Sequence, residues 1–185
     1  VAGRGIVHSE RTPDELRAFN GSSRAHGIQT WVALPREHEE SAPSFEHHPV
    51  TSLPKLRRPG VQLRVIAGDA WDKVSPVRVL SRTLYVDATL EAGATLELPA
   101  DHVDRAAYVS VGQVVCEDVA YGPGQMLVFT TGAAARLSAT EASRLMLLGG
   151  DALDGPRYVW WNFVSSDRER IERAKVDWRE ERFGP

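Results

Sequence analysis

Two residues near the amino end, His8 and Glu10, have the types and spacing that most clearly suggest chemistry. They follow a glycine turn at Gly3 and Gly5, which predicts entry into a short strand. On a strand, alternate side chains share a face, so the imidazole and the carboxylate would lie roughly 6–7 Å apart. Such a pair can bind one metal ion and suits Fe(II), Mn(II) or Zn(II) better than a thiol-loving ion. The same spacing also fits two ordinary polar residues on a half-exposed strand.

A second group of histidines lies in a stretch from Pro35 to Gly60 that contains five prolines and no strand or helix periodicity. This composition predicts a linker that follows the surface. His38, His47 and His48 lie in it. The adjacent pair could bind a metal, although a solvated surface is the commoner role of such histidines.

Composition bounds the class of protein. The 185 residues are 42% hydrophobic and 25% charged, with a net charge of −3, which predicts one globular domain or two small ones. No basic field favours direct binding of nucleic acid, and no apolar run is long enough to favour a membrane. The single cysteine, Cys116, excludes an internal disulfide and predicts a cytoplasmic location. No signal peptide is visible, but the first residue is Val1 rather than Met, which leaves an upstream segment open.

The elements that position these residues follow from the hydrophobic pattern. From Val61 onward, short apolar runs recur every 8–12 residues between Gly and Pro turns, which predicts a β-sandwich or jelly roll. Alternation is clearest in 83–90, where Leu84, Val86, Ala88 and Leu90 should face the core. The predicted strands are 61–67, 83–90, 94–98, 106–111, 113–116, 125–129, 134–137 and 145–148.

Three further elements are expected outside that region. A short helix is predicted from Pro13 to Asn20, and residues 27–34 are predicted to form a strand. Ser166 and Glu169 have the spacing of a capping box, which predicts a final helix to about Arg182. The many arginines of this helix could bind nucleic acid, but the acidic residues between them favour a solvent-exposed helix face instead.

An internal comparison suggests a repeat. Residues 3–8 (GRGIVH) and 122–127 (GPGQML) share glycines at the first and third positions. If they are equivalent points of two related barrels, the first carries the ligand His8 and the second carries Leu127 instead. A six-residue match is weak support, since such turns are common before strands.

Several motifs together resemble the pirin family in its bacterial form. They are residues 3–10 (GRGIVHSE), 26–35 (HGIQTWVALP), 160–166 (WWNFVSS) and 169–172 (ERIE), with Ala174 and Trp178. The resemblance runs in register over nearly the whole chain. It implies an all-β bicupin, in which two cupin barrels (double-stranded β-helices, or jelly rolls) pack side by side beside a C-terminal helix.

The resemblance also implies a site. The family's first barrel holds a mononuclear iron through three histidines and one glutamate, and His8 and Glu10 match the third histidine and the glutamate. The other two histidines come from an early His-x-His motif that this sequence lacks, so the first barrel is partial. The resemblance therefore implies three parts. Residues 1–55 would be the end of the N-terminal cupin plus a Pro-rich linker, residues 56–165 the C-terminal cupin and residues 166–185 the helix. A partial barrel exposes unpaired edges, so we expect either upstream residues or a partner to cover it.

Some pirins that this chain resembles act as quercetin 2,3-dioxygenases, which implies a flavonol substrate, O2 and an Fe(II) cofactor, although another divalent metal is possible. In that scheme His8 is a ligand, and Glu10 is both a ligand and the base that takes the flavonol proton. One alternative is a metal-dependent regulatory protein that binds a protein partner without turnover. The other is a fragment with a stable second barrel and no activity.

Overall fold

The computed structural model describes residues 1–12, 14 and 27–183. The chain divides into two compact units, which we describe separately. One unit comprises Glu46–Ala152, and the other comprises Val1–Phe45 together with Leu153–Pro185.

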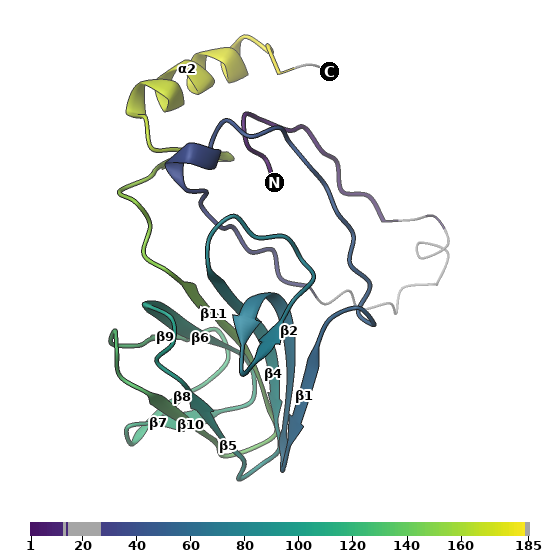
Figure 1. Cartoon of the computed structure of the whole chain (residues 1–185), viewed down its shortest axis with the longest axis vertical. Coiled ribbons are helices and arrows are strands. Elements are labelled where there is room, and N and C mark those ends of the chain that lie inside the picture. The colour runs from purple at the N-terminus through teal and green to yellow at the C-terminus, as the bar shows by residue number, and fades with distance from the viewer. Residues whose placement is uncertain (13, 15–26, 184–185) are drawn as a thin grey trace. The chain divides into compact units, whose positions relative to one another are not determined.

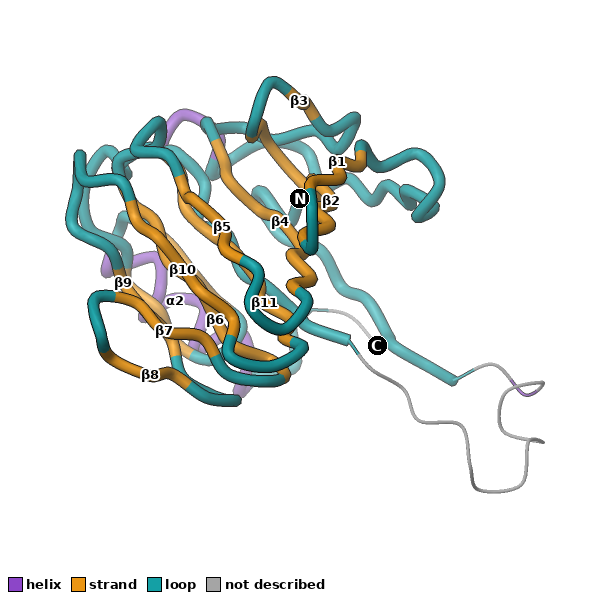
Figure 2. Tube along the Cα trace, turned by 90° about the horizontal axis from the view of Figure 1, so that it is seen from below, coloured by secondary structure: helices purple, strands orange, loops and turns teal. Residues whose placement is uncertain are grey.

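The unit Glu46–Ala152 is built from two antiparallel sheets (Figures 1 and 2). The larger sheet has the order β1-β2-β4-β11-β6-β9, with β3 paired to β2. Its strands are β1 (Lys55–Arg58), β2 (Val61–Ala70), β3 (Lys73–Val74), β4 (Thr83–Leu90), β6 (Asp104–Val111), β9 (Met126–Val128) and β11 (Ser143–Gly150). The smaller sheet has the order β5-β10-β7-β8, with strands β5 (Thr95–Leu98), β7 (Val114–Cys116), β8 (Val119–Tyr121) and β10 (Ala135–Ala139).

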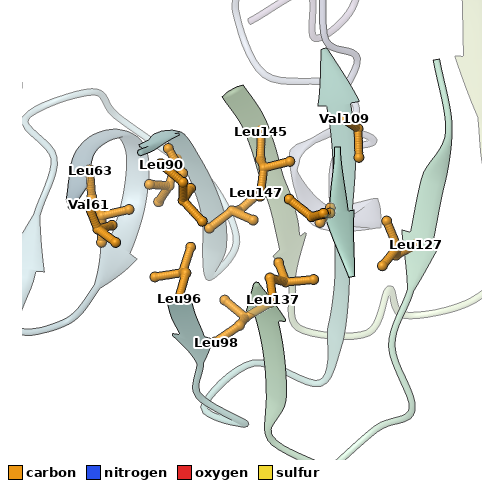
Figure 3. Close-up of a cluster of buried hydrophobic side chains, with 14 of the residues drawn as sticks. Val61, Leu63, Leu90, Leu96, Leu98, Val109, Leu127, Leu137, Leu145 and Leu147 are labelled. Atoms are coloured by element: carbon orange, nitrogen blue, oxygen red, sulfur yellow. The ribbon is translucent and has the colours of Figure 1, made fainter. Parts of the chain in front are cut away.

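The core of this unit lies between the two sheets. Figure 3 shows leucines of β5 and β10 pointing toward leucines and valines of β2, β4 and β11. Leu84, Val86, Ala88 and Leu90 of β4 are all buried, as the alternation predicts. Long branched side chains fill this interior, which stabilises the sandwich by removing apolar surface from water.

The predicted all-β class and all eight strands predicted from Val61 onward are confirmed, with ends that differ by a few residues. Three strands of this unit, β1, β3 and β8, were not predicted. The error matters most for β1, which lies in the stretch interpreted as a linker. Three of its four residues are basic and exposed, so it shows no alternation, and it forms because its backbone pairs with β2.

Among its described residues, the other unit contains the short 3-10 helix η1 (Arg36–His38), one hairpin and the helix α2 (Arg168–Arg179). Strands β12 (Tyr158–Trp160) and β13 (Phe163–Ser165) pair, and helix α2 follows. The predicted final helix is confirmed, but its cap is Asp167, whose side chain accepts from the Glu169 amide, rather than Ser166. Aromatic side chains of the hairpin and of α2 pack edge to face, with the ring centroids of Trp161 and Trp178 4.2 Å apart.

Two expected strands of this unit are absent from the described residues. Residues 6–10 and 27–34 are extended but form no ladder with any described strand. Apolar residues such as Val7 and Trp31 are largely exposed there. Without a neighbouring strand, the backbone groups of these segments have no ladder to join, so no strand forms. The predicted helix from Pro13 lies outside the described residues, apart from Asp14. No helix in the described part is long and apolar enough to cross a bilayer.

Candidate functional site

His8 and Glu10 lie in an extended, irregular segment at the amino end, and both are exposed. Neither side chain forms a hydrogen bond or an ion pair with another described residue. Because no strand forms here, the structure does not impose the shared face that the strand interpretation predicted. The two donors are thus accessible.

Backbone hydrogen bonds hold the residues just before this pair against residues 41–44. The Val1 nitrogen and the Ser44 amide each donate to the other residue's carbonyl, at 2.8 and 3.0 Å, and the Arg4 amide donates to the Ser41 carbonyl at 3.0 Å. Gly3 has a φ of +53°, and a Cβ there would lie 2.0 Å from the Ser41 carbonyl oxygen. The glycine turn singled out from the sequence is therefore a close backbone crossing, which only glycine can occupy without distortion.

Glu39 anchors residues 41–44 in turn. It follows the short 3-10 helix η1 (Arg36–His38). Its carboxylate accepts from the Ser166 amide and hydroxyl and from the Ser165 hydroxyl, at 2.9–3.1 Å. Arg157 Nε lies 2.9 Å from Oε1 of the same carboxylate, and both side chains are largely buried, at 5% and 12% exposed. This Glu39 network, comprising Glu39, Arg157, Ser165 and Ser166, joins the amino-terminal segment to the β12–β13 hairpin. Sequence reasoning missed it.

Arg157 extends the Glu39 network to a surface carboxylate. It donates to the Leu34 carbonyl at 2.7 Å and to Asp154, which also accepts from the Arg36 amide at 2.9 Å. The Arg157 hydrogen bond, followed by the Arg36 amide bond, lowers the pKa of Asp154 below its ordinary value of 3.8. Both bonds favour the charged carboxylate.

This lowered pKa predicts a loss of stability in acid. A carboxyl whose pKa is lower in the folded state contributes stability that is fully present above its unfolded pKa and is lost as the pH falls through the folded value. We therefore expect the stability difference between wild type and Asp154→Asn to shrink below about pH 3.8. Denaturant unfolding at a series of pH values measures it, and carboxyl NMR should place the Asp154 midpoint below 3.8. A stability difference that is constant down to pH 2 would contradict the assignment.

The other described histidines form no metal-binding group with His8 and Glu10. His38 lies beside Glu37 at 3.6 Å, and His48 beside Glu46 at 3.3 Å. Within residues 1–12, 14 and 27–183, no group of three or more His, Cys, Asp or Glu side chains is placed to hold a metal ion. Within the described part of the chain, a metal ion could therefore bind His8 and Glu10 but would find no third side-chain ligand beside them.

The core of Glu46–Ala152 contains apolar and structural side chains rather than metal ligands. Leu127, the counterpart of His8 in the internal comparison, is buried among apolar side chains. Arg105 is also buried, and its guanidinium donates to the carbonyls of Pro99, Thr130 and Ala133. These bonds tie two loops together at one end of the sandwich, which gives the arginine a structural role.

His102, which the sequence did not single out, lines a cavity of about 10 Å³ between Trp71 and Pro99. Its Nε2 lies 3.0 Å from the Asp69 carbonyl oxygen, while Nδ1 is buried and has no hydrogen-bond partner among the described residues. The space is about that of one water molecule. It is too small for a flavonol.

The two antiparallel sheets with an apolar interior define a cupin-type protein with a C-terminal helix, and comparison with known proteins supports this class. The profile of the pirin C-terminal cupin domain matches residues 85–184, more than half of the chain. A pirin-like protein of Caulobacter vibrioides is 46% identical over 180 residues, which cover 97% of this chain and 61% of the relative. The chain belongs to the pirin family.

Two further relatives carry a catalytic name. A Pseudomonas aeruginosa protein, named provisionally as a quercetin 2,3-dioxygenase, is 32% identical over all of this chain and 57% of its own length. A crystal structure of quercetin 2,3-dioxygenase from Acinetobacter baumannii is similar, with a TM-score of 0.75 and 26% identity over 84% of this chain and 52% of that one. The chain thus spans about three fifths of the length of the curated relatives that it matches.

Proposed function

We propose that this chain contributes His8 and Glu10 to the metal centre of a pirin-type quercetin 2,3-dioxygenase. The observation that carries the proposal is the glycine turn at Gly3, whose close crossing with Ser41 fixes the chain just before two accessible donors. The catalytic names of the Pseudomonas and Acinetobacter relatives support the reaction class.

The donors fit such a centre in type but not in number. Neutral imidazole and carboxylate are the ligands that non-haem iron prefers, but an iron held by three histidines and one glutamate needs two more donors. Among the six histidines of the sequence, none forms a His-x-His motif. We therefore assign the missing ligands to the part of the relatives' length that this chain does not cover.

The proposed role of Glu10 is to accept a proton from the substrate. An exposed carboxylate with an ordinary environment can accept the proton of an acidic flavonol hydroxyl that lies within hydrogen-bond distance. His8 binds a metal only as neutral imidazole, so metal affinity should fall in mild acid. We propose Fe(II) as the resident ion, with a flavonol as substrate and O2 as oxidant.

The test uses protein expressed from its complete gene and reconstituted with Fe(II). We expect quercetin absorbance to fall in air faster than with free iron. The His8→Ala variant should lose this activity and bind iron about 100-fold more weakly, because it loses a ligand. Metal content after dialysis measures the binding independently of turnover.

His38→Ala is the matched control, since it removes an accessible histidine outside the pair. It should keep wild-type iron content and activity. Equal iron loss in both variants would contradict the assignment of His8. If wild type retains iron through His8 but consumes no quercetin, the dioxygenase proposal fails and a metal-dependent interaction protein becomes the better reading.

A further inference from the structure

Strand β1 (Lys55–Arg58) ends the larger sheet, with β2 on one side and no described strand on the other. Its sequence, Lys-Leu-Arg-Arg, is basic in a chain whose net charge is −3. Leu56 packs against the core, whereas the three basic residues are exposed. A sheet edge of this kind presents unpaired backbone groups to solvent.

The register identifies which backbone groups these are. The Val65 amide donates to the Pro54 carbonyl at 3.0 Å, so Pro54 and Val65 form a hydrogen-bonded pair. Hydrogen-bonded and non-hydrogen-bonded pairs alternate along an antiparallel ladder. Leu56 and Arg58 therefore direct their amides and carbonyls toward β2, and those of Lys55 and Arg57 point to the free edge. No described residue forms a backbone bond to these four groups.

The same two residues place their side chains on the outer face of the sheet. Lys55 lies opposite Arg64, and Arg57 opposite Gln62, while the intervening Leu56 faces the core. Residues directly opposite share a face, so Lys55, Arg57 and Arg64 form one positive surface, which we call the β1 basic edge.

The nearest acidic side chain on this face is already neutralised. Asp87, opposite Arg64 on β4, is nearly buried. It accepts two hydrogen bonds from Arg144, at 2.8 and 2.9 Å, and one from Arg64 at 3.3 Å. Neither Lys55 nor Arg57 has an ion-pair partner among the described residues.

We propose that the β1 basic edge docks an extended acidic segment of a partner protein as an added antiparallel strand. Two residues of such a segment would pair with the free amides and carbonyls of Lys55 and Arg57, and its acidic side chains would lie opposite these cations. A second copy of β1 is the wrong partner, because pairing would place Lys and Arg against Lys and Arg. The inference is independent of the metal site.

The test measures binding of a short, capped, fluorescent peptide of alternating glutamate and valine by anisotropy. The double variant Lys55→Glu with Arg57→Glu should bind about tenfold more weakly, because two attractive cross-strand pairs become repulsive. It should prefer the matching lysine–valine peptide. The control double variant Lys73→Glu with Arg136→Glu makes the same change of charge at exposed positions on β3 and β10 and should bind like wild type.

A second peptide separates strand pairing from attraction between charges. N-methylation of the peptide amides that face β1 keeps every charge but removes the donors, so binding should be lost. Equal binding of the N-methylated peptide, or equal loss in the control double variant, would overturn the docking mode in favour of non-specific polyanion attraction. Absence of any binding by the acidic peptide would overturn the proposal itself.

Discussion

Replacing Glu39 by alanine is expected to lower the free energy of unfolding of its unit by about 3 kcal/mol. The substitution removes the carboxylate that lies 2.9 Å from Arg157 and accepts from Ser165 and Ser166. Arg157 is only 5% exposed, so its charge would lose its closest buried partner without gaining water. Breaking a buried ion pair from one side costs more than the pair itself contributes, because the remaining charge stays desolvated.

Tryptophan fluorescence during denaturant unfolding measures this effect. Four of the five tryptophans, Trp31, Trp160, Trp161 and Trp178, lie in the unit that contains Glu39. Loss of Glu39 should also speed hydrogen exchange at the Arg4 and Ser44 amides, since these two amides donate the hydrogen bonds that join residues 1–4 to residues 41–44.

Glu40→Ala is the matched control. Glu40 is the next residue in the chain and also pairs with an arginine, Arg170, but its side chain is 70% exposed. An exposed ion pair contributes little because water screens it, so this change should cost less than about 1 kcal/mol. If Glu39→Ala and Glu40→Ala lower the free energy of unfolding equally, burial does not decide how strongly the Glu39 network stabilises this unit.

Leu147→Ala is expected to destabilise the cupin unit by about 3–4 kcal/mol. Leu147 lies on β11 between Val86 and Ala107 of the neighbouring strands and is 0% exposed. Truncation removes buried apolar atoms and leaves a cavity, and the surrounding strands cannot close it without breaking their ladders. Figure 3 shows the leucine among side chains of both sheets.

Far-UV circular dichroism during denaturant unfolding measures this loss of stability, since all strands of the larger and the smaller sheet lie in this unit. Val128→Ala also truncates an apolar side chain of this unit, on β9, at a position that is 80% exposed, and should lower the free energy of unfolding by less than about 1 kcal/mol. A loss of stability for Leu147→Ala below that for Val128→Ala would contradict the description of a filled, rigid interior.

The sequence by itself determined the sandwich and its core. Strands such as β4 bury one face, so their side chains alternate in polarity along a few neighbouring residues, and this local pattern can be read without any partner. Strand β1 escaped prediction because its order comes from pairing with β2 rather than from its own residues. The expected strands at 6–10 and 27–34 failed for the converse reason, since alternation alone does not supply a neighbour.

For the candidate site, the glycine turn and the pair His8 and Glu10 were visible in the sequence because they lie within eight residues. The role of Glu39, which holds the segment that pairs with this turn, was not visible in the sequence. Glu39 meets Ser166 across 127 positions, and a glutamate between a histidine and another glutamate has no local feature that marks it as buried. Only the tertiary structure decided that role, because burial and the pairing of charges depend on which distant segments the folded chain brings together.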